Sequence, residues 1–192
     1  MVNEDFSEEE RREIINYSMK RVKVRALFFL YVVLAGVILN VLFEGLLFWF
    51  SFCCIRKYAG GYHADTQVRC SLISGGIIIV VFMLLKFTPI SMIVGILLQI
   101  GSYLVIVIFS PVENKNRKLN HNEKKRFRRK TRVISSALFI GTSFMYFYDS
   151  KHYIWSMVIA YLTVAILIIM GMCKNFIEDS DIKENGLIND RE

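Results

Sequence analysis

The chain has 192 residues, of which 54 % are hydrophobic, and it carries a formal net charge of +7. Its length leaves room for about one domain. Its mean hydropathy of +0.42 and the gathering of its apolar residues into long uncharged runs exclude an ordinary soluble globular domain.

The apolar runs indicate helices in a membrane. They are 26–43, 45–55, 71–85, 87–110, 133–148 and 153–173. A helix needs roughly 20 apolar residues to cross a hydrocarbon core about 30 Å thick, which two of the runs reach and the others approach. The runs lack the alternation of barrel strands. We predict a single all-α domain over 1–192, a polytopic helical integral membrane protein with about six membrane segments. Four full spans plus a re-entrant pair is the alternative.

The first 25 residues are charged and show no cleavable signal sequence. Ser7 and Glu10 form a capping-box pattern, and apolar residues then recur at helical spacing among Lys and Arg. This pattern predicts an amphipathic helix over 1–25 that lies on the cytoplasmic membrane surface. A plain cytosolic anchor helix is the alternative.

Residues 26–55 are too long for one perpendicular span and short for two. Because Asn40, Glu44 and Gly45 interrupt the apolar sequence, we predict a hairpin that turns over 40–45. The alternative is one tilted span. Glu44 is a functional candidate by its depth in the membrane, or it ends the hairpin turn.

Two further helix pairs follow along the chain. Runs 71–85 and 87–110 are predicted to turn over 86–89, with Pro89 at the start of the second helix. Runs 133–148 and 153–173 are joined by 149–152, and residues 174–192 form an acidic tail that we expect to be flexible. This arrangement places both termini in the cytoplasm.

The segment 111–132 has ten Lys or Arg and two Glu, a local balance of +8. A basic run can bind nucleic acid, but both ends of this one enter apolar runs, so the positive-inside rule is the simpler account. We therefore expect a basic cytoplasmic loop and no nucleic-acid partner.

The four cysteines are Cys53, Cys54, Cys70 and Cys173, and all lie in or beside apolar runs. They form no C-x-x-C pair and no Cys/His set with zinc spacing. We expect reduced thiols, no metal and no other cofactor.

The polar segment 56–70 holds the chemistry. Only here do a histidine and a cysteine, His63 and Cys70, share one polar segment. A cysteine attacks as its thiolate, and an imidazole can take the thiol proton and later protonate a leaving amine. On one continuous helix the two Cα atoms would be about 10.5 Å apart, too far for a hydrogen bond. The pair therefore requires a bend between them.

The surrounding residues can supply that bend and support the reaction. An N-cap at Asp65 or Thr66 would place Cys70 early in a helix, where the helix dipole favours a thiolate. The amides of Gly60 and Gly61 can approach an oxyanion unhindered. Asp65 either orients His63 or serves only as the cap. Taken alone, Cys70 can also be a small apolar residue entering a span.

The motifs of this segment resemble those of the accessory gene regulator B (AgrB) family. The resemblance rests on Arg56, Gly60-Gly61-Tyr62-His63-Ala64 and Cys70, followed by a membrane pair, Pro111-Val112-Glu113-Asn114-Lys115 and a basic loop. It covers about 10–175. One departure is Lys118, where the family pattern leads us to expect proline, which affects the local geometry of the loop.

The resemblance implies a multi-pass cysteine endopeptidase of the bacterial cell membrane, with its active site facing the cytoplasm and a homodimeric state. Cys70 would be the nucleophile and His63 the general base and acid, while Arg56 and Gly61 match other positions the family needs for activity. The partner would be an AgrD-like autoinducer propeptide with an acidic C-terminal tail. Cleavage through a Cys70 thioester would let the peptide close a thiolactone or lactone ring.

The acidic tail of such a propeptide calls for a basic binding surface. The candidates are Lys115, Arg117, Lys118, Lys124, Lys125, Arg126, Arg128, Arg129 and Lys130. Anchoring of the topology and contact with anionic membrane lipids are the alternative role of these residues.

Two other function classes compete with the peptidase. A small transporter or channel would use Glu44 and Asn40 to line a polar path, and would tolerate replacement of Cys70. A non-enzymatic scaffold would recruit partners through the basic loop, and would leave the Gly-Gly-x-His…Cys spacing unexplained.

Overall fold

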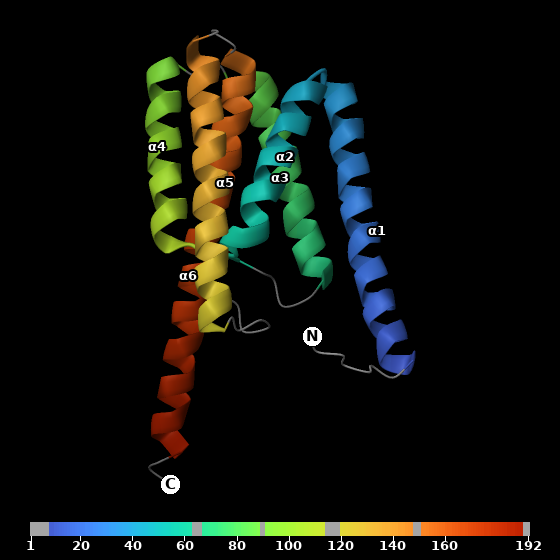
Figure 1. Ribbon diagram of the computed structural model, residues 1–192, viewed down its shortest axis with the longest axis vertical. Helices are drawn as coiled ribbons and strands as arrows, with labels where there is room; N and C mark the ends of the chain where they lie inside the picture. The colour runs from blue at the N-terminus through green and yellow to red at the C-terminus, as the bar shows by residue number, and fades with distance from the viewer. Residues whose placement is uncertain (1–7, 63–66, 89–90, 114–119, 148–150, 190–192) are drawn as a thin grey trace.

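The computed structural model describes residues 8–62, 67–88, 91–113, 120–147 and 151–189. Within these ranges the chain forms six helices (Figure 1). They are α1 (Glu8–Leu39), α2 (Leu42–Ala59), α3 (Gln67–Phe87), α4 (Met92–Phe109), α5 (His121–Phe147) and α6 (Lys151–Asn189). The described residues contain no β-strand, only one isolated β-bridge. The predicted all-α class is confirmed.

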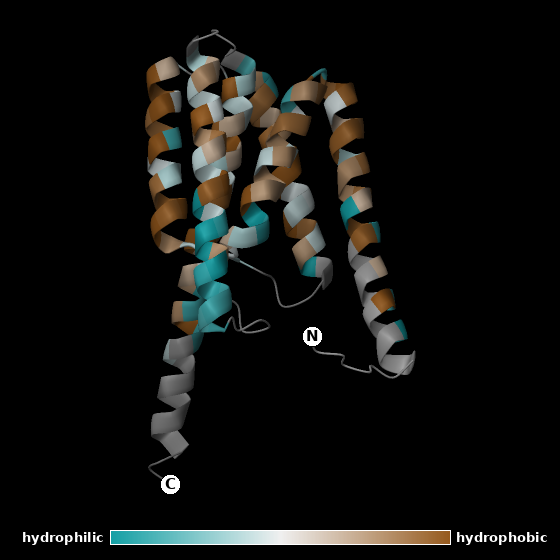
Figure 2. Cartoon of the chain, viewed as in Figure 1, coloured by the Kyte–Doolittle hydropathy of each residue, from teal (hydrophilic) through white to brown (hydrophobic). Residues whose placement is uncertain are grey.

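Four helices are long and apolar enough to cross a membrane. Their apolar windows are Val22–Leu39 in α1, Arg69–Phe87 in α3, Met92–Phe109 in α4 and His152–Glu178 in α6. In Figure 2 the hydrophobic colour covers most of the helix bundle, and the hydrophilic colour gathers at the lower end of α5. The protein is a polytopic helical membrane protein. The shorter or more charged α2 and α5 complete a six-segment arrangement that this finding allows.

The first turn falls where the sequence predicted it. α1 ends at Leu39, and Asn40 takes a left-handed conformation with φ 57° before α2 begins at Leu42. Asparagine tolerates this conformation better than most residues. The amide of Val41 donates to the carbonyl oxygen of Gly36 at 2.9 Å, which closes the turn. One tilted span over 26–55 is therefore excluded.

The other two turns also lie at the predicted places. α3 ends at Phe87, and α4 begins at Met92 behind Ser91, whose hydroxyl oxygen accepts from the amide of Val94 at 3.4 Å. Pro89, expected at the start of that helix, lies outside the described residues. α5 ends at Phe147 and α6 begins at Lys151. All three turns lie at one end of the bundle and both termini at the other (Figure 1).

Three stretches differ from expectation because helix continues through them. α1 has no break near residue 25, where neither glycine nor proline interrupts it, so the charged segment from Glu8 and the first apolar segment form one continuous helix. The basic segment is helical from His121 onward rather than a loop. The tail expected to be flexible belongs to α6, which runs to Asn189.

The basic part of α5 begins with a capping pair. The side-chain oxygen of Asn120 accepts from the amide of His121 at 2.7 Å, and Glu123 accepts from the amide of Asn120 at 3.2 Å. These two bonds satisfy amides that the first turn of a helix leaves unpaired. The capping residues therefore start the helix inside the basic segment.

α6 is the central helix. Of its apolar window 61 % is buried, against 11–22 % for the other three candidate spans. It packs mainly against α2 and α4. Tyr161 of α6 is fully buried with Ile55 of α2 and Ile106 of α4, and its hydroxyl donates to the carbonyl oxygen of Ser135 in α5. A second apolar cluster joins α2 and α3 through Phe48 and Phe82.

Candidate functional site

The chain leaves α2 through two glycines in left-handed conformations. Gly60 has φ 71° and Gly61 has φ 106°, values that side-chain-bearing residues rarely adopt. The amide of Val112, just after α4, donates to the carbonyl oxygen of Ala59 at 3.0 Å, and the Gly61 amide donates to Val112 at 3.4 Å. A Cβ atom at Gly60 would collide with the Val112 carbonyl oxygen. The segment 60–62 is thus held against the segment after α4.

The same segment lies on α6. The amide of Tyr62 donates to the carbonyl oxygen of Leu167 at 2.8 Å. Gly171 faces the segment so closely that a Cβ atom there would lie 2.6 Å from the Tyr62 nitrogen and 2.7 Å from the Gly61 carbonyl carbon. The side chain of Asn175 donates to the carbonyl oxygen of Glu113 at 2.9 Å. One stretch of α6 therefore supports both segments.

Arg56 closes the segment from the α2 side. Its guanidinium group donates to the carbonyl oxygens of Gly60 and Tyr62. Its planar fork of donors suits two carbonyl oxygens at once.

Cys70 is the fourth residue of α3, early in a helix as the sequence predicted. It lines a cavity of about 190 Å³ together with Arg56 and Tyr62. The rest of the lining is mostly aromatic and aliphatic: Phe28, Phe48, Trp49, Phe52, Ile73, Ser74, Ile77, Ile78 and Leu167. The arrangement sets a thiol and a cation in the wall of one mostly apolar cavity that can accept an apolar side chain.

His63, the second residue of the expected dyad, lies outside the described part of the chain. So do Asp65 and Thr66, the two residues expected to cap the helix that carries Cys70. α2 ends at Ala59 and α3 begins at Gln67, so no single helix joins the two halves of the segment. The bend that a His63–Cys70 pair requires falls on residues 63–66, outside the described part of the chain.

The Gly61 amide is engaged differently from the oxyanion role expected of it. Its bond to the Val112 carbonyl oxygen makes it part of the bridge between the two segments. The Gly61 amide can donate to an oxyanion only if its hydrogen bond to Val112 breaks. In this structure, Gly60 and Gly61 supply the turn and the close approach to Val112 and α6.

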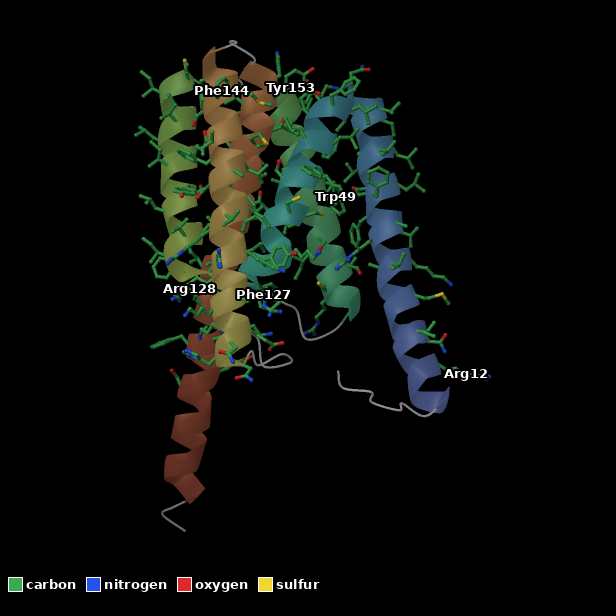
Figure 3. All side chains as sticks on the ribbon, in the orientation of Figure 1. Arg12, Trp49, Phe127, Arg128, Phe144 and Tyr153 are labelled. Atoms are coloured by element: carbon green, nitrogen blue, oxygen red, sulfur yellow. The ribbon has the colours of Figure 1, made fainter. Side chains whose placement is uncertain are left out.

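The basic residues form an exposed face of α5 at the end of the bundle nearest the segment 60–62 (Figure 3, which labels Phe127 and Arg128). Three of them have structural contacts. Lys124 pairs with Glu113 at 2.9 Å, Arg128 donates to the carbonyl oxygen of Ser110 at 3.3 Å, and Lys130 lies 5.1 Å from the centre of the Tyr58 ring.

Three other candidate cations of α5, Lys125, Arg126 and Arg129, are exposed, and the described part of the chain gives them no ion pair. Lys115, Arg117 and Lys118 lie outside the described residues.

Comparison with known proteins identifies the family. The family model described as "Accessory gene regulator B" (AgrB) matches residues 1–171. The chain belongs to the AgrB family. A "Putative AgrB-like protein" from Clostridium perfringens strain SM101 is 28 % identical over 174 residues, covering 85 % of this chain and 80 % of that protein. "Putative AgrB-like protein 2" from strain 13 is 28 % identical over 158 residues, covering 77 % and 72 %. No solved structure matches the chain.

The AgrB match includes Arg56, Val112, Leu167 and Gly171, which all contact the segment 60–62, and it ends at Gly171. Sequence reasoning assigned no contact with this segment to three residues: Val112, Leu167 and Gly171. Leu167 and Val112 act through backbone atoms, so their side chains carry no signal. Gly171 interrupts an apolar run, but only its partner across the bundle shows why a side chain is excluded there.

Proposed function

We propose that this AgrB-family chain is a membrane cysteine endopeptidase that removes the C-terminal tail of an AgrD-like autoinducer propeptide. The observation that carries the proposal is Cys70, early in α3, which lines a mostly apolar cavity together with Arg56 and Tyr62. A thiol so placed suits attack on the carbonyl of a peptide whose apolar side chain fills the cavity.

The reaction follows from the chemistry of the groups. His63 takes the proton of the Cys70 thiol, and the thiolate attacks the carbonyl carbon at the junction of core and tail. Collapse of the tetrahedral intermediate breaks the peptide bond, and the imidazolium gives its proton to the departing amine of the tail. The core remains as a thioester on Cys70.

Ring closure needs no further reagent. A Cys or Ser side chain of the core attacks the thioester carbonyl, which forms a thiolactone or lactone and releases the Cys70 thiol. The apolar cavity wall favours this step over hydrolysis because it limits water near the thioester. The thioester retains much of the reactivity of the acyl group, so the reaction consumes no ATP.

The surroundings of Cys70 prepare the site rather than react. Arg56 fixes the carbonyl groups of Gly60 and Tyr62, and α6 fixes the amide of Tyr62, immediately before His63. The segment that carries His63 thus starts from a defined backbone position. Asp65 is a candidate to orient the imidazole.

The placement of the enzyme completes the proposal. It is a homodimer in a bacterial cell membrane, with Cys70 facing the cytoplasm, where the positive-inside rule would put the basic face of α5. That face receives the acidic tail of the propeptide. Anchoring to anionic lipids is its second role.

The test is co-expression of a candidate propeptide with wild-type protein, Cys70→Ala and His63→Ala, read out by mass spectrometry. We expect the wild type to release the tail and both variants to leave the propeptide intact. A trapped acyl-enzyme mapped to Cys70 would establish the nucleophile. Normal processing by Cys70→Ala would reject the peptidase and return attention to Glu44, half-buried in the first turn of α2.

A further inference from the structure

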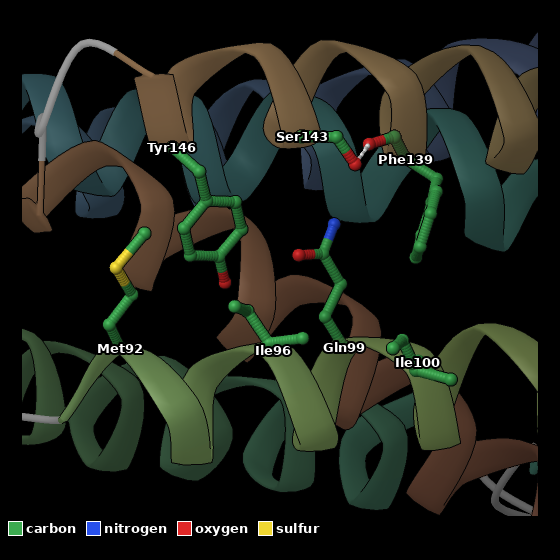
Figure 4. Close-up of a pocket in the computed structure, with 7 residues that line it drawn as sticks. All are labelled: Met92, Ile96, Gln99, Ile100, Phe139, Ser143 and Tyr146. Carbon is green, nitrogen blue, oxygen red and sulfur yellow. Dashed lines mark hydrogen bonds between the residues drawn. The ribbon is translucent and has the colours of Figure 1, made fainter.

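A second cavity lies between α4 and α5, and none of its lining residues lines the Cys70 cavity. Its volume is about 400 Å³, within the range of roughly 300–1,000 Å³ typical of small-molecule pockets. Figure 4 shows the side chains that line it. Met92, Ile96 and Ile100 come from α4 and Phe139 from α5, and these four are apolar.

Three polar residues complete the lining: Gln99, Ser143 and Tyr146. Gln99 is only 2 % exposed, and its Nε2 atom has no hydrogen-bond partner among the described residues. The buried hydroxyl of Tyr146 also lacks a partner there, whereas Ser143 donates to the carbonyl oxygen of Phe139 at 2.9 Å. A buried polar atom without a partner is costly, so the cavity requires an occupant that pairs with Gln99 and Tyr146.

The chemistry of the lining restricts that occupant. No charged residue lines the cavity, which disfavours an ion. Water alone is a poor filling, because the space is worth about a dozen molecules at about 30 Å³ each and most of the wall is apolar. The two unpaired groups, an amide N–H₂ and a phenol O–H, donate hydrogen bonds. The occupant is therefore neutral, mostly apolar, and carries a carbonyl oxygen.

The position of the cavity indicates the source of that carbonyl. The cavity runs from Met92, the first residue of α4, inward to Ile100. The apolar part of α5, residues 133–147, is about 22 Å long, against a hydrocarbon core of about 30 Å. A bilayer thins beside so short a segment, which brings the ester groups of its lipids closer to Gln99.

We propose that the cavity between α4 and α5 binds one acyl chain of a membrane diester glycerolipid, whose ester carbonyl oxygen accepts hydrogen bonds from Gln99 and Tyr146. This site is independent of the peptidase reaction. It also explains a division in the contact between the two helices. Toward the basic end they meet directly, through the Tyr103 and Ser136 hydroxyls at 2.9 Å, and beyond that contact the lipid chain fills the space between them.

The test compares two lipids that differ only in the carbonyl. The purified full-length protein is loaded with dioleoyl phosphatidylglycerol or with its diether analogue, and native mass spectrometry measures how much of one lipid per chain survives activation. We expect the diester to be retained about thirty-fold better than the diether, the effect of two net hydrogen bonds. A free fatty acid, as a third probe, should bind no better than the diether.

Variants of Gln99 and Tyr146 test whether the difference in lipid retention arises in this cavity. Gln99→Leu and Tyr146→Phe each remove one donor at nearly constant volume and should each lower retention of the diester part of the way, and the double variant should lower it to the level of the diether. Ser102→Ala, a change of a buried polar residue of α4 outside the cavity lining, is the matched control and should keep the preference.

A diester lipid with a photoreactive acyl chain tests where on the protein the lipid binds. Labelling should fall on residues 92–100 and 139–146. Equal retention of diester and diether by the wild type, a preference that survives in the double variant, or labelling confined to other helices would each overturn the proposal.

Discussion

At Gly171 the absence of a side chain lets the backbone of Gly61 and Tyr62 pass directly over α6. The contact distances leave no room for a Cβ atom, and the opposing atoms belong to backbone, which cannot rotate away as a side chain can. The amide of Tyr62 takes the carbonyl oxygen of Leu167 at the same place. The position of the residues before His63 therefore depends on Gly171 having no side chain larger than a hydrogen atom.

We predict that Gly171→Ala lowers the rate of propeptide cleavage by about ten- to a hundred-fold, because displacing the segment before His63 by an ångström misaligns the reacting groups. Quantitative mass spectrometry of the released tail measures the rate. Gly141→Ala is the matched control, since a Cβ atom there meets nothing within 4 Å.

The amount of each variant in the membrane is the first control. Both variants should reach the membrane at wild-type amounts. Cleavage by Gly171→Ala at the wild-type rate would mean that the segment can shift off α6 without loss of alignment, while failure of Cys70→Ala to abolish cleavage would reject the peptidase itself.

At the scale of elements, α5 joins a basic segment and an apolar segment in one helix. Its basic first half was expected to be a loop, but the capping residues at Asn120 and Glu123 start a helix that continues into the apolar half. Cations on a helix keep a fixed spacing, and three of them are already used to fasten α5 to Glu113, Ser110 and Tyr58. Lys125, Arg126 and Arg129 are the ones best placed to meet a partner.

We predict that the triple variant Lys125→Gln, Arg126→Gln and Arg129→Gln raises KM for a propeptide with an acidic tail by about ten-fold and leaves kcat unchanged, since each exposed charge contributes weakly. Steady-state cleavage assays measure both constants. A propeptide whose tail acids are replaced by amides is the control, because its KM should be the same for the wild type and the triple variant.

The Lys124→Gln variant separates recognition from structure. Loss of its pair with Glu113 should affect acidic and neutral tails alike. If the triple variant also impairs both tails equally, or inverts the topology of α5, then the basic face anchors the protein and does not recognise the tail.

The elements could be predicted from the sequence to the extent that their causes are local. Apolar runs interrupted by Asn40 or by the residues near Phe87 show where helices turn, and Cys70 was correctly placed early in a helix. The continuity of α1 and α6 was missed, because a change from apolar to charged composition was read as the end of a helix when no residue ends it. The contact of the segment 60–62 with α6 is long-range and depends on backbone atoms.

At the scale of the whole molecule, the three turns lie at one end of the bundle and both termini at the other (Figure 1). The segment 60–62 and the basic half of α5 lie toward the end with the termini. The six described helices make this possible only if α2 and α5, the two without a long apolar window of low charge, cross as far as their neighbours do. The short apolar part of α5 suggests that the bilayer adapts to it.

We predict that single cysteines at Asn40 and His152, placed in an otherwise cysteine-free chain, react with a membrane-impermeant maleimide in intact cells. Cysteines at Lys57 and Lys125 should react only after permeabilisation, because the positive-inside rule predicts that the basic end lies in the cytoplasm. Gel shifts measure the labelling. Protection of Asn40 from both sides would instead indicate that α1 and α2 form a re-entrant pair.

The contact between Tyr62 and α6 also sets an order of events during synthesis. The segment 60–62 enters the membrane early, whereas Leu167 and Gly171 belong to the last helix and leave the ribosome long afterwards. Until they arrive, Arg56 and Val112 are the contacts among the described residues that can fix the backbone before His63. A nascent chain therefore carries its thiol through most of its insertion without its full set of neighbours, and the arrival of the final span supplies the last contacts of the segment 60–62.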